Sequence, residues 1–526
     1  MADCCKLALL CAFSVYGVLV SVSGVPLSAA VACSVFVFPF ALLQLAKRLP
    51  STSFGWWDLA TLVAFSPLFF VYVTSPGADA AMYAAIARAL LDGSADLSAA
   101  HPGVRVAMYP RAYPGLIAAF APSLGMPKAS LLAAVFAYVS YVVGLSFWLR
   151  KVVAPKHALA SAVLITLVAR NVPLSFFSWG GNPTIMAFGM ALTAVSLAAD
   201  AQRRSLLACA ALVLMGGFAV HPIGAIGGTA CAPLVVAWPQ LERARVLRVC
   251  VIAIPALSLG FAFKHLGPQI SVREAEWIAR WPLGAAALLK GRFGMFALDY
   301  LEAFARACGV VLTSISIVFL GVALRARGEP RKLAWLALFG LAYVALLVIV
   351  GPRLPVLGGF IYADRLSPMW PVVIAPMLSV VGLRMRPWPR LLQLMAATAA
   401  IALAHANWRN GEPLIDADEL ALADCIRSQV PRRAWIVASY GQGGQWLPAL
   451  TGHPITQPHT HCSLFDETDS LRLSVDARYQ LVSQHEAQYA PMLPELPALE
   501  TLCEHGGAKL IRLNAAAPRI PIPGVY

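Results

Sequence analysis

Asp79 is the residue whose type and position best suit acid–base chemistry in this chain. It stands in the segment PGADAAMYAAIARALLDG, after a turn and at the start of an amphipathic helix that the pattern predicts over 79–92. A carboxylate that is partly shielded from water and within reach of a hydroxyl group can accept its proton as a general base. The same side chain could instead cap a helix that begins at Ala80. On the residues alone, both interpretations stay open.

Other polar and aromatic side chains stand where they could bind a ligand, and each also has a structural explanation. Trp179 and Asn182 belong to the turn SWGGNP, whose glycines allow a backbone to come close to a ligand, but tryptophan also anchors helices at a membrane surface. His221 precedes a proline, where a turn histidine with satisfied hydrogen bonds is favoured over a catalytic one. Arg365 could hold a phosphate with two hydrogen bonds, pair with Asp364, or reach toward lipid headgroups. The remaining candidates for substrate binding are Tyr83, Arg88, Tyr113 and Trp446.

Composition places these residues in a polytopic membrane protein. Of the 526 residues, 59% are hydrophobic and only 13% are charged, and the mean hydropathy is +0.71, which excludes an ordinary soluble globular chain. Apolar runs long enough to cross a bilayer recur as far as about residue 405, and they predict about thirteen transmembrane helices. We therefore expect an all-α membrane domain over 1–405.

Basic residues predict the orientation of these spans, because short loops rich in lysine and arginine stay in the cytoplasm. Such residues fall on alternate loops, which predicts a cytoplasmic N-terminus and outer loops that include 75–128 and 264–303. The net charge of +14 is then a signal of topology, and nucleic-acid binding is not predicted. The interiors of the predicted spans contain almost no ionisable residues, which argues against an ion-coupled transporter.

The composition becomes polar near residue 406, which predicts an extracytoplasmic α/β domain over 406–526. Its pattern indicates helices over 416–429 and 475–487 and strands at RAWIVASY and AKLIRLN, with a GQGG turn that brings Trp446 toward the membrane. The spacing of this turn matches no nucleotide fingerprint. Three of the eleven cysteines lie in this domain, where a disulfide is permitted, and a bridge from Cys462 to Cys503 is predicted.

A family resemblance adds to this pattern. GADAAMYAAIARALLDG, followed by a polar loop and MYPRAYPGLIAAFAP, resembles the first outer loop of GT-C membrane glycosyltransferases, in which an acid precedes a tyrosine-containing helix and a proline-led helix. More narrowly, the chain resembles a group of actinobacterial polytopic membrane proteins related to that superfamily. The segments that match this group are FSWGGNPTIMAFGMALTAVSLA, GFAVHPIGAI, FIYADRLSPMWPV and WLPALTGHPI.

The resemblance implies a GT-C fold in the plasma (inner) membrane, a polyprenyl-phosphate sugar as the donor, and an acceptor that is a cell-envelope glycan or lipid. Asp79 would then be the base, and the sugar would be transferred with inversion. Because a phosphate leaves as an anion that arginine or lysine can stabilise, no second acid is needed to protonate it.

The chain departs from the commonest GT-C pattern at Ala80, where many relatives have a second acid. A divalent ion needs several oxygen ligands, and Glu274, Glu276 or Asp299 could provide them only from a distant loop. A divalent metal is therefore possible but not favoured, and the sequence indicates no other cofactor. Two other functions stay open: binding or export of a lipid-linked glycan without chemistry, and a non-catalytic assembly scaffold.

Overall fold

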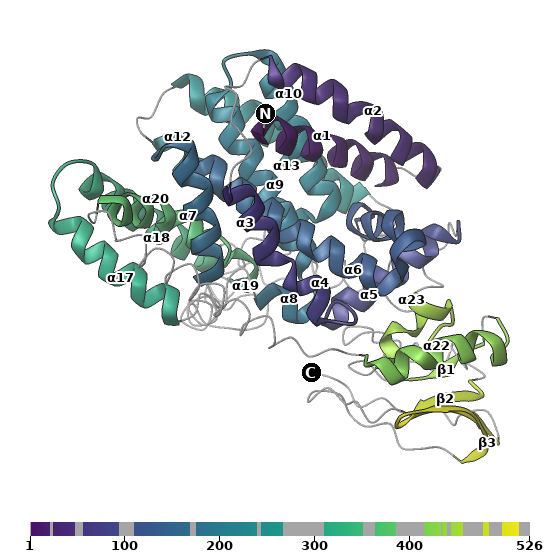
Figure 1. Cartoon of the computed structure of the whole chain (residues 1–526). Coiled ribbons are helices and arrows are strands. Elements are labelled where there is room, and N and C mark those ends of the chain that lie inside the picture. Colours follow the sequence, from purple (N-terminus) through teal and green to yellow (C-terminus); the bar gives the residue numbers. More distant parts are fainter. Residues whose placement is uncertain are drawn as a thin grey trace, which may run out of the picture. The chain divides into compact units, whose positions relative to one another are not determined.

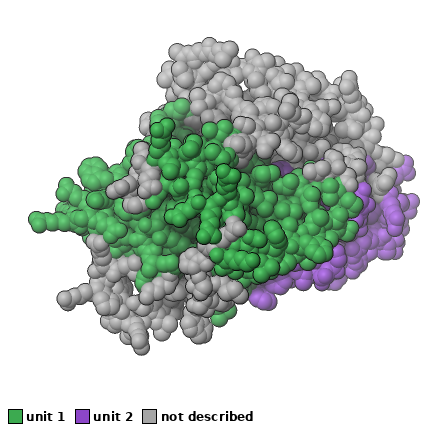
Figure 2. All heavy atoms as spheres, turned by 90° about the horizontal axis from the view of Figure 1, so that it is seen from above, with its two compact units in different colours: residues 1–67, 135–176, 182–408 green, residues 68–134, 177–181, 409–526 purple. Residues whose placement is uncertain are grey.

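The structure is a computed structural model of the chain. It describes residues 2–21, 25–47, 56–93, 110–168, 175–238, 243–266, 310–350, 363–384, 415–432, 434–438, 443–455, 477–482 and 497–514 (Figure 1). The chain divides into two compact units, coloured in Figure 2: residues 1–67, 135–176 and 182–408 form unit 1, and residues 68–134, 177–181 and 409–526 form unit 2. The boundary predicted near residue 406 lies outside the described residues and stays a prediction.

Unit 1 is helical throughout its described residues. Its helices are α1 (Ala2–Ser21), α2 (Leu27–Ala46), α3 (Trp56–Phe65), α7 (Pro155–Val168), α9 (Asn182–Asp200), α10 (Arg204–Val220), α11 (Pro222–Thr229), α12 (Ala232–Ala237), α13 (Arg243–Leu266), α17 (Val310–Arg325), α18 (Glu329–Val350), α19 (Ala363–Leu366) and α20 (Met369–Arg384). Helix α6 (Ala112–Leu149) bends at Gly125, where the backbone leaves the helical conformation, and it contributes its second part to unit 1.

Several of these helices have the length and composition of membrane spans. Among the described residues, five helices (α1, α2, α6, α9 and α18) are long and apolar enough to cross a bilayer. Large apolar side chains stand exposed on the outside of α2 and α18, among them Phe36, Phe40, Trp335 and Phe339. Such surfaces suit contact with lipid. The finding supports a membrane protein, whereas the predicted number of thirteen spans is not confirmed.

Helix α9 is the core of unit 1, because every residue from Asn182 to Ala199 is buried. Glycines allow its neighbours to approach closely. A Cβ atom on Gly144 of α6 would overlap the carbonyl group of Gly189, and one on Gly189 would overlap the backbone of Ser140. Close contact between small residues is a common way in which helices pack inside membranes.

Charged residues of unit 1 pair at the ends of its helices. Asp3 lies 2.6 Å from Arg150, and Lys6 pairs with Asp58. Lys151, which follows α6, pairs with the last residue of α9, Asp200. The described helices therefore keep these charges out of their apolar middles, which agrees with the scarcity of ionisable residues inside the predicted spans.

Unit 2 begins with most of α4 (Pro67–Val71) and contains α5 (Ala78–Leu91), the first part of α6 and the end of α8 (Ser175–Trp179). Its C-terminal part comprises α22 (Ala417–Gln429), β1 (Ile436–Val437), the 3-10 helix η4 (Gly443–Trp446), α23 (Leu447–Thr451), β2 (Tyr479–Val482), β3 (Ala498–His505) and β4 (Ala508–Leu513). The four strands form one mixed sheet in the order β1-β2-β4-β3.

The sequence predicted part of this C-terminal architecture. The helix expected over 416–429 is α22, which begins at a capping box formed by Asp416 and Glu419. The last strand is β4, as predicted. The helix expected over 475–487 is wrong, because Tyr479–Val482 is a strand that pairs parallel to β1 and antiparallel to β4. An aromatic residue and a valine in this short run suit a strand held on both sides.

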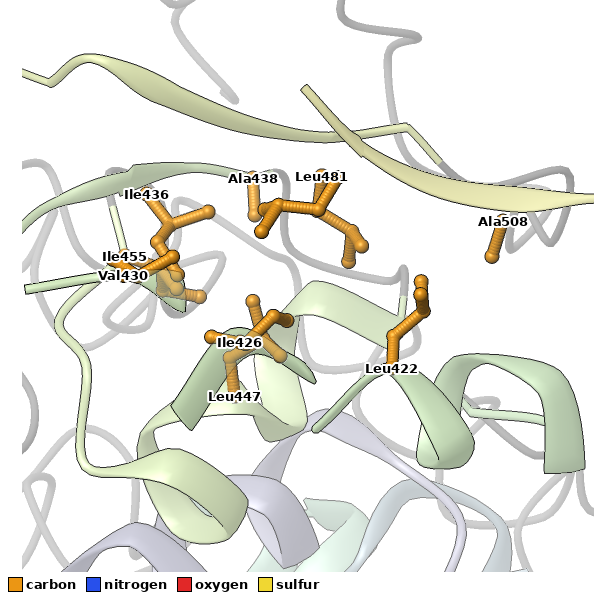
Figure 3. Packing of buried hydrophobic residues seen from close by; sticks show 10 residues of the cluster. Leu422, Ile426, Val430, Ile436, Ala438, Leu447, Ile455, Leu481 and Ala508 are labelled. Atoms are coloured by element: carbon orange, nitrogen blue, oxygen red, sulfur yellow. The ribbon is translucent and has the colours of Figure 1, made fainter. Parts of the chain in front are cut away.

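Alternating side chains bury both faces of the sheet. Ile436 and Leu481 point toward the helices and pack on Ile426 and Leu447 (Figure 3). Val437, by contrast, belongs to a cluster on the opposite face with Ala477, Ile511 and Leu513. Such alternation with a period of two residues is what a strand between two apolar layers requires.

A disulfide joins Cys425 of α22 to Cys503 of β3. The sequence predicted a bridge from Cys503 to Cys462, which lies outside the described residues. The bridge from Cys503 to Cys425 corrects this expectation. The reason is the packing of α22 beside β3: Leu422, one turn before Cys425, lies in the same core as Leu510, and this brings the two Cα atoms to 6.5 Å. Disulfides persist in oxidising compartments, which agrees with the predicted extracytoplasmic position.

We predict that replacing both Cys425 and Cys503 with serine lowers the stability of the C-terminal part by about 2–4 kcal/mol, because the bridge closes a long loop in the unfolded chain. Thermal unfolding of the purified protein measures the loss. Replacing Cys33, a free and exposed cysteine of α2, is the control. Equal melting temperatures for the double variant and the control would show that the bridge does not stabilise the protein.

A buried histidine makes this part sensitive to pH. The imidazole of His453 lies between two elements, with Nε2 3.3 Å from the carbonyl oxygen of Val430 and Nδ1 3.0 Å from the hydroxyl oxygen of Thr451. Burial disfavours its charged form and lowers its pKa below the ordinary value of 6.5, although the hydrogen bond to Val430 opposes this shift.

The unfolded chain therefore binds a proton at His453 below about pH 6.5, whereas the folded chain binds it only at lower pH. We predict that stability falls between these two pKa values as the pH decreases, with a slope of up to about 1.4 kcal/mol per pH unit. Hydrogen exchange of the segment 443–455 at several pH values measures the slope. In His453→Gln this pH dependence should disappear, and a slope that persists in the variant would assign it to another group.

Candidate functional site

The site begins at Gly77, the residue that starts helix α5. Gly77 has a φ of 89° and precedes the helix as its N-cap, and its carbonyl oxygen accepts a hydrogen bond from the N–H of Ala80 at 3.1 Å. A Cβ atom on Gly77 would overlap the backbone of Trp179 and Gly180. Only glycine combines a positive φ with such a close approach of two backbones.

Gly180 makes the reciprocal contact. It ends α8, with its N–H donating to Phe177 at 3.2 Å, and it has a φ of 88°. A Cβ atom on Gly180 would overlap the backbone N of Ala80 and lie 3.0 Å from Cβ of Asp79. The two turns thus lock against each other, and we call this contact the glycine clasp, formed by Gly77 and Gly180.

The glycine clasp fixes the position of Asp79. Asp79 lies in the first turn of α5 and is partly exposed, whereas every residue from Ala80 to Ala87 is buried. The positive end of the helix dipole favours a negative charge at this position. The alternative in which Asp79 caps a helix beginning at Ala80 is wrong, because the helix begins at Ala78 and Gly77 occupies the N-cap.

Two of the predicted tyrosines come together one turn along the same helix. The rings of Tyr83 and Tyr113 lie edge to face with centroids 5.4 Å apart, and both side chains are buried. Residues four apart share a face of a helix, so Tyr83 lies on the Asp79 face of α5. The pair therefore ties this face to the beginning of α6, which is a positioning role.

Arg88 does not lie near Asp79. Its guanidinium pairs with Asp92, with Nε 2.9 Å from a carboxylate oxygen, near the C-terminal end of α5. It stands nine positions after Asp79 along the helix, a distance of about 13 Å. The structure thus places Arg88 in an exposed pair that is typical of helix surfaces.

The two predicted tryptophans of unit 2 differ in exposure. The ring of Trp179 lies over Gly181, where a Cβ atom would overlap it, and the side chain is half-buried. Trp446 in η4 is 0% exposed, and within the described part of the chain its indole Nε1 has no hydrogen-bond partner. Leaving a buried donor unpaired costs about 1–3 kcal/mol, so the packing of the Trp446 ring must offset this cost.

The other three predicted residues belong to unit 1. Asn182 is the first residue of α9 and is buried. His221 separates α10 from α11, and its Nδ1 accepts a hydrogen bond from the N–H of Gly224 at 3.3 Å and lies 3.3 Å from the hydroxyl of Thr184. His221 thus caps α11, as the turn interpretation expects.

Arg365 lies in α19, with its guanidinium carbon 6.0 Å from the centre of the Phe176 ring. Helix α11 packs on both α9 and α19. The structure therefore gathers Asn182, His221 and Arg365 on three neighbouring elements of unit 1, and it gathers Asp79, Tyr83 and Tyr113 with the glycine clasp in unit 2.

Metal ligands are a separate question. Within the described ranges, no group of three or more His, Cys, Asp or Glu side chains lies close enough to hold a metal ion. Glu274, Glu276 and Asp299, the acids considered from the sequence, lie outside those ranges.

Sequence analysis missed what the paired glycines do. It assigned Gly180 and Gly181 to close approach of a ligand, whereas in the structure Gly180 approaches the backbone beside Asp79. Gly77 was not identified. The signal was present as a glycine directly before the helix that carries the acid, but the partner lies about a hundred residues away, and residue types alone do not reveal such a pair.

No known family model matches the chain, and no curated protein matches it. Three solved structures show a distant likeness. ArnT from Cupriavidus metallidurans bound to undecaprenyl phosphate has 13% identity, covers 86% of this chain and 97% of its own, and has a TM-score of 0.47. The apo oligosaccharyltransferase of Archaeoglobus fulgidus has 14% identity, coverages of 81% and 69%, and a TM-score of 0.43.

The archaeal oligosaccharyltransferase AglB from Archaeoglobus fulgidus, in complex with an inhibitory peptide and a dolichol-phosphate, has 14% identity, the same coverages and a TM-score of 0.40. Because all three scores are below 0.5, this likeness does not establish a shared fold.

We predict that Gly77→Ala and Gly180→Ala each destabilise unit 2 more than Gly93→Ala does. All three glycines have a positive φ, which costs an alanine about 1–2 kcal/mol, but nothing lies within 4 Å of a Cβ on Gly93. Thermal unfolding with local hydrogen exchange over 68–93 measures the difference. Equal losses in all three variants would mean that the clasp adds nothing to the backbone strain.

Proposed function

We propose that this protein is an integral membrane glycosyltransferase of GT-C type. It moves a sugar from a polyprenyl-phosphate donor to a cell-envelope acceptor on the outer side of the plasma membrane. The observation that carries the proposal is the glycine clasp, which holds a partly exposed carboxylate at the start of a buried helix in a chain rich in apolar helices. The resemblance of the segment around Asp79 to the first outer loop of GT-C enzymes supports it.

In the proposed reaction, the hydroxyl oxygen of the acceptor attacks the anomeric carbon of the donor sugar. Asp79 accepts the hydroxyl proton as the new bond to carbon forms. The bond between this carbon and the phosphate oxygen breaks, and the polyprenyl phosphate leaves with the electron pair. Attack from the face opposite the phosphate inverts the anomeric centre.

The leaving phosphate needs a cation instead of a proton. Arginine forms two parallel hydrogen bonds to a phosphate and stays charged at any physiological pH. Arg365 is the residue that we propose for this role. Its guanidinium lies over the ring of Phe176, with the guanidinium carbon 6.0 Å from the ring centre, whereas Arg88 forms a surface ion pair with Asp92.

A fixed carboxylate explains why the clasp would be needed. General-base catalysis contributes about 10²–10⁴-fold to a rate, and only when the base lies within hydrogen-bond distance of the proton that it removes. A displacement of about 1 Å can cost a hundredfold. Two interlocked backbones hold Asp79 more rigidly than a loop would.

We predict that Asp79→Asn lowers transfer at least 100-fold while the protein still folds and retains its lipid, because the amide is nearly isosteric but cannot accept the proton. The assay uses proteoliposomes, radiolabelled polyprenyl-phosphate sugars and acceptor extracted from the host envelope. Asp92→Asn is the matched control, since Asp92 is an exposed acid at the other end of the same helix, and it should transfer normally.

Normal transfer by Asp79→Asn would contradict the proposed base. In another outcome, the wild type and the variants all retain the lipid-linked sugar but none of them transfers it. This result would favour a protein that binds or exports the glycan without chemistry.

A further inference from the structure

Helix α5, which carries Asp79, depends on other elements for its stability. A helix of 14 residues is marginal in water by itself, yet all of its residues from Ala80 to Ala87 are buried. Because burial extends over more than two turns, it includes every side of the helix. The glycine clasp and the contact of Tyr83 with Tyr113 account for only part of this burial.

The C-terminal part of unit 2 also contributes to the burial of α5. Both η4 and α23 pack against α5, and every side chain from Leu447 to Thr451 is buried. The η4–α23 segment, residues 443–451, is itself held in place. Arg427 of α22 donates a hydrogen bond to the carbonyl oxygen of Leu450 at 3.1 Å, and Gly452 ends α23 in the left-handed conformation.

Trp446 stands apart from the core of the C-terminal part. It is among the largest fully buried side chains of the described chain, but it belongs to neither of the two clusters that cover the faces of the sheet. Its neighbour Leu447 does belong to the cluster on the helix side. The Trp446 ring thus lies apart from these two clusters, and α5 is an element that η4 contacts.

Gly444, in η4, allows a close approach to the end of β1. A Cβ atom on Gly444 would overlap the side chain of Ala438, next to β1. The absence of a side chain at Gly444 lets η4 pack on Ala438 without a clash. This contact gives Gly444 a structural role that needs no bound phosphate.

We propose that Trp446 is a positioning residue for Asp79. Through the packing of the η4–α23 segment on α5, the C-terminal part of the chain fixes the helix that carries the base. The effect of Trp446 on catalysis rests on the function proposed above. The packing of the η4–α23 segment on α5 is independent of that function. Because the indole N–H has no hydrogen-bond partner among the described residues, we attribute the effect to the volume and apolar surface of the ring.

The test compares hydrogen exchange of the α5 peptide, residues 78–91, in the intact protein and in three variants. Trp446→Ala removes the ring and should increase the exchange rate of α5 about tenfold or more. Trp446→Phe keeps an aromatic ring without the N–H and should protect α5 nearly as well as the wild type. Trp435→Ala, the matched control, removes a partly buried tryptophan from the opposite face of the sheet and should leave α5 unchanged.

Unchanged exchange of α5 in Trp446→Ala would overturn the proposal. So would an equal increase in Trp435→Ala, because it would show that α5 responds only to the general stability of the domain. Transfer kinetics provide a second measurement: a displaced base should lower kcat in Trp446→Ala with KM nearly unchanged, and Trp446→Phe should restore most of kcat.

The two proposals fail in different ways. If α5 exchanges faster in Trp446→Ala while Asp79→Asn transfers sugar normally, the docking of the C-terminal part on α5 stands and the proposed base is wrong. If Asp79→Asn is inactive and α5 exchange is insensitive to Trp446, the base stands and the positioning role of Trp446 is overturned.

Discussion

The contact between the backbones of Gly77 and Gly180 is the constraint on which the candidate site depends. Each glycine has a positive φ, and each would overlap the other turn if it had a side chain. Each position therefore requires a residue that adopts a positive φ and that has no Cβ atom, and only glycine meets both requirements. The consequence is that Asp79, two residues after Gly77, has a fixed place at the start of α5.

The same physical device recurs in other parts of the chain. Gly144 and Gly189 bring α6 and α9 together, Gly224 lies against the carbonyl group of Thr184, and Gly444 lies against Ala438. In each case the missing side chain removes a clash, so that the glycine backbone can make dispersion contacts with its neighbour. Close contacts of this kind let helices with few charges pack tightly, and the ion pairs described above lie at helix ends.

The sequence predicted those elements whose signals are local. Helix α5, helix α22 with its capping box and strand β4 lie where the pattern places them, because periodicity and caps act within a few residues. The failures involve distant partners. Tyr479–Val482 is a strand only because β1 and β4 flank it, Cys503 pairs with a cysteine on α22, and Gly77 meets a glycine from another segment. Arg88 is of a residue type that suits substrate binding, but it forms an ion pair with Asp92 on the same helix.

The binding of a lipid-linked sugar at Asp79 is tested most directly by native mass spectrometry of the protein released from its own membranes. The co-purified lipid is fragmented and identified. The account predicts a polyprenyl phosphate that carries a sugar, bound at one molecule per chain. Bulk phospholipid alone, from a preparation shown to retain tightly bound ligands, would contradict it and would favour a scaffold in which the clasp serves only the fold.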